Sequence, residues 1–133
     1  MILVDTSVLL DVLKDEQEWA DRSEAALVAA SAIGGIAIDD IVYAELSTRY
    51  RRIEDLDAAI GAMGLTHAPI PRAALFLAGK AFLRYRKLGG TRTGVLSDFF
   101  IGAHAAVEGW PLLTRDDGRV KAYFPTVELI APA

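Results

Sequence analysis

Short, continuous apolar runs alternate along the chain with segments of helical periodicity. The apolar runs lie at residues 2–4, 36–38, 65–70, 111–114 and 127–130. A strand covered by helices on both faces needs no polar side, so each run predicts a short buried strand. Apolar residues spaced three or four apart predict helices after residue 5 and over 18–32, 41–51, 54–63, 71–88, 97–108 and 119–123.

This order of elements predicts the fold class. Alternating strands and helices indicate an α/β protein, an α/β/α sandwich in which helices flank a central, mainly parallel β-sheet. The chain has 133 residues, without an internal repeat or a low-complexity linker, so we expect a single domain over residues 1–133. Such sheets bind ligands at the carboxyl ends of their strands.

The composition excludes several classes of protein. Hydrophobic residues make up 53% of the chain, which excludes intrinsic disorder, and the lack of cysteine excludes disulfides, thiolate metal sites and cysteine nucleophiles. The cysteine-free composition fits the cytoplasm. The longest early uncharged run, residues 25–38, has 14 residues, and the N-terminus has no basic leader region. We therefore expect neither a membrane span nor a signal peptide. A mean hydropathy of +0.29 predicts apolar surface that a partner or a second copy covers.

Charge is unevenly distributed along the chain. The net charge of −4 argues against a simple basic nucleic-acid binder. No acid occurs between residues 58 and 97, where Arg72, Lys80, Arg84, Arg86 and Lys87 lie. Arg92 belongs to the same basic stretch. The stretch is either a solvated helix face or a surface that contacts phosphates.

Four acids stand where a parallel sheet brings distant residues together. Asp5 follows the first predicted strand and Asp116 follows the fourth. Asp98 lies at the start of a predicted helix, and Glu45 lies just over one turn into another. Strand ends and the starts of the following helices share one edge of such a sheet, so these four carboxylates can converge there.

Convergent carboxylates repel one another unless a cation is present. Oxygen ligands without histidine or cysteine suit Mg²⁺ or Mn²⁺ rather than Zn²⁺. Two such ions about 4 Å apart can hold the attacking and leaving oxygens of a phosphodiester. The pattern therefore indicates a metal-dependent phosphodiester hydrolase.

Each acid also has an ordinary structural interpretation. Asp5, Asp98 and the pair Asp39-Asp40 could cap helices, Asp117 could cap the helix at 119, and Glu45 could pair with Arg49. Asp11 is expected to face solvent. His104 is expected to be structural, since it lies about 240° around the helix from Asp98, and His67 has no evident partner.

The joint pattern resembles a known family. Asp5-Thr6-Ser7-Val8-Leu9-Leu10-Asp11, Val42-Tyr43-Ala44-Glu45-Leu46, the run from Ser97 to Ala105, and Leu113-Thr114-Arg115-Asp116 resemble the four acidic motifs of PIN-domain ribonucleases, in the form typical of VapC toxins. The motifs occur in the family's order and span nearly the whole chain. Ser97 replaces the proline associated with its position, which changes the helix cap and not the chemistry.

The resemblance implies a PIN-like fold and an Mg²⁺- or Mn²⁺-dependent endoribonuclease, the toxin of a type II VapBC toxin–antitoxin system. By the same resemblance, Asp5, Glu45, Asp98 and Asp116 are the catalytic and metal-binding residues, with hydroxyls supplied by Thr6, Ser7 and Thr114. It also implies inhibition by a cognate VapB-type antitoxin, an RNA substrate and a homodimer.

Two alternatives stay open on the residues alone. One is a PIN-like domain that binds without cleaving, although the presence of all four acids argues against it. The other is a phosphatase of the aspartyl-phosphate type or a phosphorelay receiver. The phosphatase pattern needs an aspartate at the position of Ser7. The receiver needs a lysine near the end of the chain and next to a strand, whereas Lys121 lies on a predicted short helix.

Overall fold

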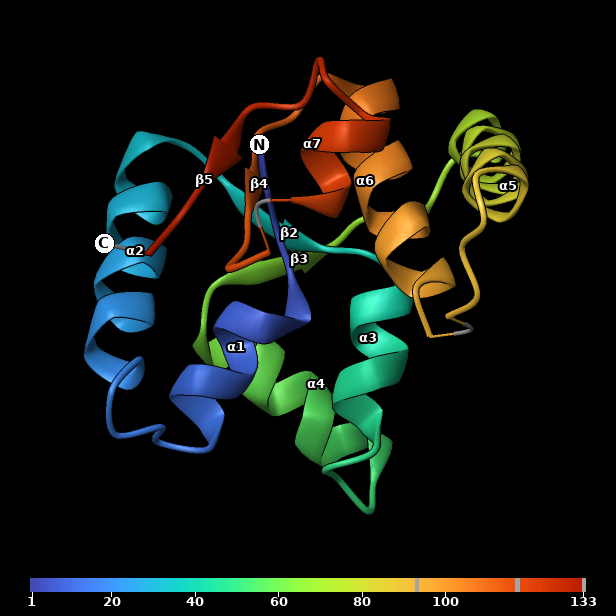
Figure 1. Ribbon diagram of the computed structural model, residues 1–133. Coiled ribbons are helices and arrows are strands. Elements are labelled where there is room, and N and C mark those ends of the chain that lie inside the picture. Colours follow the sequence, from blue (N-terminus) through green and yellow to red (C-terminus); the bar gives the residue numbers. More distant parts are fainter. Residues whose placement is uncertain (93, 117, 133) are drawn as a thin grey trace.

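The structure, a computed structural model, describes residues 1–92, 94–116 and 118–132. In chain order its elements are β1 (Ile2–Val4), α1 (Thr6–Leu13), α2 (Ala20–Ile33), β2 (Ile36–Ile38), α3 (Asp40–Ser47), α4 (Ile53–Ala62), β3 (Leu65–His67), α5 (Arg72–Lys87), α6 (Leu96–Glu108), β4 (Leu112–Leu113), α7 (Arg119–Tyr123) and β5 (Leu129–Ile130) (Figure 1). The predicted alternation of strands and helices is confirmed.

The strands form one sheet in the order β3-β2-β1-β4-β5, and every neighbouring pair is parallel. Val4 of β1 pairs with Leu113 of β4, and the amide of Asp5 continues this ladder by donating to the Leu113 carbonyl at 2.9 Å. The residues that follow the two strands, Asp5 and Thr114, are therefore neighbours.

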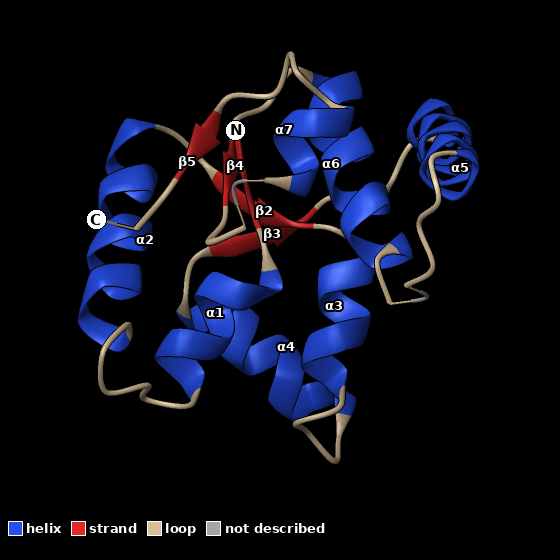
Figure 2. Ribbon diagram, in the orientation of Figure 1, coloured by secondary structure: helices blue, strands red, loops and turns tan. Residues whose placement is uncertain are grey.

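Helices cover the sheet on both sides, which makes the predicted α/β/α sandwich (Figure 2). Helix α2 lies on one side, and α6 and α7 lie on the other, with α5 packed mainly on α6. Helices α1, α3 and α4 gather beyond the carboxyl end of β1 (Figure 1). The central strands are buried on both faces, in agreement with their continuous apolar sequences.

Close packing fixes α7 against α6. A Cβ added at Gly102 of α6 would stand 2.6 Å from Cδ2 of Phe124, which directly follows α7. Only glycine allows this approach. Phe99, one turn earlier on α6, is fully buried and meets the Phe124 ring edge-on at 6.3 Å. This contact sets the start of α7 near the start of α6.

Helix α3 ends earlier than the periodicity predicts. It ends at Ser47 rather than near Arg51. The hydroxyls of Ser47 and Thr48 donate to the carbonyls of Ala44 and Glu45 at 2.6 and 2.8 Å. Hydroxyl bonds of this kind compete with backbone bonds in the last turn, so the chain leaves the helix there.

Exposed apolar side chains lie on α2 and on α5. The first two helices carry more apolar residues than one core-facing stripe needs, which predicts surplus apolar surface there, at Leu9, Leu10, Leu13, Trp19, Leu27 and Val28. Leu9 and Leu27 are buried, whereas Val28 and Ile33 of α2 are exposed. Helix α5 also exposes Leu75, Phe76, Leu77 and Leu83. Within the described ranges, no helix is long and apolar enough to cross a bilayer.

Candidate active site

Asp5 is held rigidly at the carboxyl end of β1. It is the N-cap of α1, and its Oδ1 accepts from the Thr6 amide at 2.8 Å. Its Oδ2 accepts from the Ser7 hydroxyl at 2.9 Å and from the Thr114 hydroxyl at 2.7 Å. Asp5 is thus a helix cap, as its structural interpretation predicts. The bonds from Thr114 and Ser7 also fix the orientation of its carboxylate, so the cap is compatible with a metal site.

Glu45 reaches the same edge from α3. Its Oε1 accepts from the Thr6 hydroxyl at 2.7 Å, so Thr6 bonds to one acid through its amide and to another through its side chain. In the described part of the chain Glu45 forms no ion pair with Arg49, which was its alternative interpretation.

A buried bond joins α6, the helix that carries Asp98, to the start of α3. Nδ1 of His104 on α6 lies 3.1 Å from Oδ2 of Asp39, and both side chains are almost fully buried. Asp39 also caps α3 by accepting from the amides of Ile41 and Val42. This bond fixes α6 against the start of α3, the helix that carries Glu45. The charge of Asp98 acts on Glu45 from across this contact.

Asp116 completes the group in the turn between β4 and α7. Its amide donates to the Thr114 hydroxyl at 3.0 Å, and its Oδ1 accepts from the Gly118 amide at 3.3 Å. A small hollow is lined by Asp5, Asp98, Thr114 and Asp116 over a floor of apolar side chains. Asp117, considered as a cap, lies outside the described residues.

Burial and neighbouring charges change the pKa values of Glu45 and Asp98. Partial burial, and then the charges of Asp5, Asp98 and Asp39, raise the pKa of Glu45, against the Thr6 bond that lowers it. Burial and the charge of Asp5 raise the pKa of Asp98, as does Asp116, while Arg119 lowers it. Of the four acids proposed from the sequence, the structure places Asp5, Asp98 and Asp116 around one hollow and links Glu45 to Asp5 through Thr6.

The donor set is one of oxygens: four carboxylates with the hydroxyls of Thr6, Ser7 and Thr114 nearby. Such a set fits a hard divalent cation such as Mg²⁺ or Mn²⁺. In the side-chain positions of the described residues, no three carboxylate or imidazole groups are close enough to share one ion. Each acid is instead held by a donor of the chain itself.

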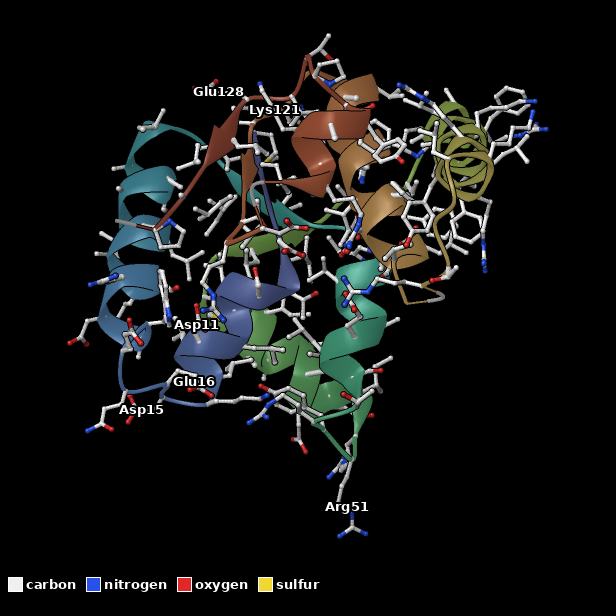
Figure 3. All side chains as sticks on the ribbon, viewed as in Figure 1. Asp11, Asp15, Glu16, Arg51, Lys121 and Glu128 are labelled. Carbon is white, nitrogen blue, oxygen red and sulfur yellow. The ribbon has the colours of Figure 1, made fainter. Side chains whose placement is uncertain are left out.

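Asp11 does not face solvent, contrary to expectation. It is 1% exposed, and its two oxygens accept from the Ser23 hydroxyl at 2.7 Å and from Nη2 of Arg115 at 3.1 Å. Figure 3 shows Asp11 between α1 and α2. The Arg115 guanidinium also lies 4.7 Å above the Trp19 ring. The Arg115 side chain, next to Asp116 in the sequence, is therefore held by Asp11 and Trp19.

The two histidines lie away from the acids. His104 is structural, as predicted, through its bond to Asp39. His67 has a partner after all, since its Nε2 lies 2.6 Å from Oδ1 of Asp40 and its ring stacks on Tyr43. Asp40 also accepts from the Ile70 amide, so it links α3 to the segment after β3.

The raised pKa values predict a pH dependence of stability. Glu45 and Asp98 titrate above their ordinary values of 4.5 and 3.8 in the folded chain, so folding takes up protons in that window. Their contribution to stability is full below the ordinary values and is lost as pH rises through the raised ones. In a chelator, we expect the thermal midpoint of the wild type, relative to a Glu45→Gln/Asp98→Asn variant, to rise as pH falls from neutral towards 5. A difference that is constant with pH would contradict this.

The chain is similar to one protein family and to several solved structures. The model of the PIN domain family matches residues 2–124. Among solved structures, VapBC2 of Rickettsia felis, bound to a DNA fragment, shares 20% identity over 98% of each chain, with a TM-score of 0.71. DNA-bound VapBC of Salmonella typhimurium shares 15% over 99% of this chain and 98% of its own, with a TM-score of 0.72.

A third similar structure is VapC20 of Mycobacterium tuberculosis, described as a Sarcin-Ricin loop cleaving toxin. It shares 16% identity over 96% of this chain and 99% of its own, with a TM-score of 0.64. No curated protein matches the sequence. The structural matches agree with the fold described above, and the family match covers all four acidic motifs. The chain belongs to the PIN domain family.

Proposed function

We propose that the chain is a metal-dependent endoribonuclease, the VapC-type toxin of a type II toxin–antitoxin system, acting as a single PIN domain in the cytoplasm. The observation that carries the proposal is the group of four carboxylates at the carboxyl edge of a parallel sheet. Family membership supports a nuclease. The similar structures of VapBC complexes and of an RNA-cleaving toxin support this class of nuclease.

We assign the metal site to Asp5, Glu45, Asp98 and Asp116. Bound Mg²⁺ or Mn²⁺ would activate water and stabilise the charge that develops on a phosphodiester. The residues of the chain prepare this site. Thr114 and Ser7 orient Asp5, Thr6 orients Glu45, and the loop after β4 presents Asp116. Asp5 and Asp98 are expected to be the firmest ligands.

The test is cleavage of RNA by the purified chain. We expect the chain to cleave a mixed RNA substrate in Mn²⁺ or Mg²⁺ and to leave it intact in chelator. Trapping experiments should detect no phosphoryl-enzyme intermediate. Sequencing the 5′ ends of the fragments would identify the cleaved site. Full activity in chelator would contradict metal dependence, and inactivity with every RNA and both metals would favour a binding module.

The exposed cations of α5 should hold RNA. Arg84, Arg86 and Lys87 lie in its last turn and are exposed. A protein of net charge −4 has no long-range attraction for RNA, so local cations must supply it. Replacing these three residues by alanine should weaken RNA binding and reduce the slope of log affinity against log salt by about two to three. An unchanged salt slope would mean that Arg84, Arg86 and Lys87 form a solvated helix face and do not bind RNA.

Two partners should cover the exposed apolar surface. We propose that a second copy covers the outer face of α5, where Phe76 is 69% exposed, and that a VapB-type antitoxin binds near the first helices. Light scattering should give a dimer, which Phe76→Glu weakens and Val28→Glu, on α2, does not. A monomer at high micromolar concentration would contradict the dimer, and RNA cleavage unaffected by saturating antitoxin would contradict the inhibitor.

A further inference from the structure

The acid cluster contains a cation of the chain itself. Nη1 of Arg119, in the first turn of α7, donates to Oδ2 of Asp98 at 2.7 Å. The two side chains are 23% and 33% exposed, so the pair is only partly screened by water. Among the described residues, this is the one ion pair that any of the four acids forms.

The other three acids are held by neutral donors. Hydroxyl and amide groups bond to Asp5, a hydroxyl bonds to Glu45, and an amide bonds to Asp116. Asp98 has no such donor in the described part of the chain, and Arg119 takes only one of its two oxygens. Asp98 is therefore the acid whose position depends on a cation.

The position of Arg119 is built into the fold. The packing of Phe124 on Gly102 sets α7 against α6, and Arg119 stands one helical turn and a little more before Phe124. Lys121 on the same short helix is turned to the other side, where its ammonium donates to the carbonyls of Pro125 and Val127 at 3.2 Å. Figure 3 shows Lys121 at the outer end of the molecule.

Charge and geometry indicate what Arg119 does. Four carboxylates that converge without a metal ion repel one another, and one guanidinium offsets part of that repulsion. A divalent ion that binds Asp98 competes for the same negative charge. A guanidinium released from a carboxylate is suited to phosphate, because its planar fork matches both groups.

We propose that Arg119 is an exchangeable counter-cation: it holds Asp98 while the cluster is without metal, and contacts a phosphate of RNA once a divalent ion takes its place. This inference rests on the proposed function, since it needs a metal and an RNA substrate. It assigns Arg119 as a further substrate-binding residue outside the four acidic motifs.

Metal binding tests the first half of the exchange without any cleavage. Mn²⁺ is titrated calorimetrically into the metal-free full chain, as wild type, Arg119→Gln, Arg119→Lys and Lys121→Ala. Loss of the competing charge in Arg119→Gln should tighten Mn²⁺ binding by about threefold to tenfold. Arg119→Lys should stay near the wild type. Lys121→Ala is the matched control, because it removes one charge from the same helix without touching the acids.

RNA binding tests the second half. Anisotropy of a labelled, mixed-sequence RNA oligonucleotide in saturating Mn²⁺ should show that Arg119→Gln binds more weakly, with a salt slope lower by about one. Arg119→Lys should retain most of the affinity. Arg119→Gln keeps the length and a hydrogen-bonding end of the side chain, and its thermal unfolding in Mn²⁺ confirms that the variant is folded.

The outcomes are separable. Mn²⁺ affinity that is unchanged or lower in Arg119→Gln would show that Arg119 only supports Asp98 and would overturn the exchange. Tighter Mn²⁺ binding with unchanged RNA affinity would overturn the transfer to phosphate. In both cases the proposed function stands. A wild type that binds no Mn²⁺ and cleaves no RNA would overturn the proposed function itself, and the inference with it.

Discussion

Replacing Asp5 by asparagine should lower metal-dependent RNA cleavage by about a thousandfold or more, because a ligand that places charge at the reacting phosphate is lost. Folding should be little affected. The asparagine oxygen can still accept from the Thr6 amide, and its NH₂ can donate to the hydroxyls of Ser7 and Thr114, since a hydroxyl accepts as well as it donates.

Cleavage rates in saturating Mn²⁺, with far-ultraviolet circular dichroism as the folding control, measure this effect. Asp98→Asn should behave in the same way. Asp21→Asn is the matched control, because it removes one exposed carboxylate from the first turn of α2 whose charge is not among those acting on Glu45 or Asp98. If Asp5→Asn or Asp98→Asn keeps full activity, the assignment of the metal site is wrong.

Replacing Arg115 by alanine should cost about 1–3 kcal/mol of unfolding free energy, the range for leaving a buried polar group without its partner. The carboxylate of Asp11 is 1% exposed and, among the described residues, would retain the Ser23 hydroxyl as its one side-chain donor. The opposite change, Asp11→Ala, should cost less, because the Arg115 side chain is 35% exposed and can turn to water.

Urea denaturation of the variants measures this asymmetry. Arg22→Ala is the matched control: its guanidinium lies 5.1 Å from the same Trp19 ring, so it shares the aromatic contact, which is worth about 0.5–1 kcal/mol. Equal losses for Arg115→Ala and Arg22→Ala would mean that the ion pair with Asp11 contributes nothing beyond that contact.

The sequence predicts much of the fold, since its strongest signals are local. Continuous apolar triplets such as Ile36–Ile38 mark the buried strands, and a glycine follows directly on α2 and on α6. The convergence of Asp5, Glu45, Asp98 and Asp116 also follows from the sequence, because a parallel sheet places all of its strand ends on one edge. The roles of these acids in metal binding stay predictions.

The contacts that sequence reasoning missed are those between distant segments. Asp11 occupies a helix position that a local pattern assigns to solvent, and its partner Arg115 comes from the far end of the chain. The pairing of Arg119 with Asp98 depends in the same way on how α7 packs on α6. No periodicity within either helix signals these contacts, which arise only from tertiary packing.

The neighbouring positions of β1 and β4 in the sheet have a consequence during translation. Thr114, which orients Asp5, and Asp116 are made 109 and 111 residues after Asp5. A nascent chain that ends before β4 lacks both of these groups. The proposed nuclease activity is therefore expected only in chains that extend past β4, and a chain released by the ribosome before that point should be inactive.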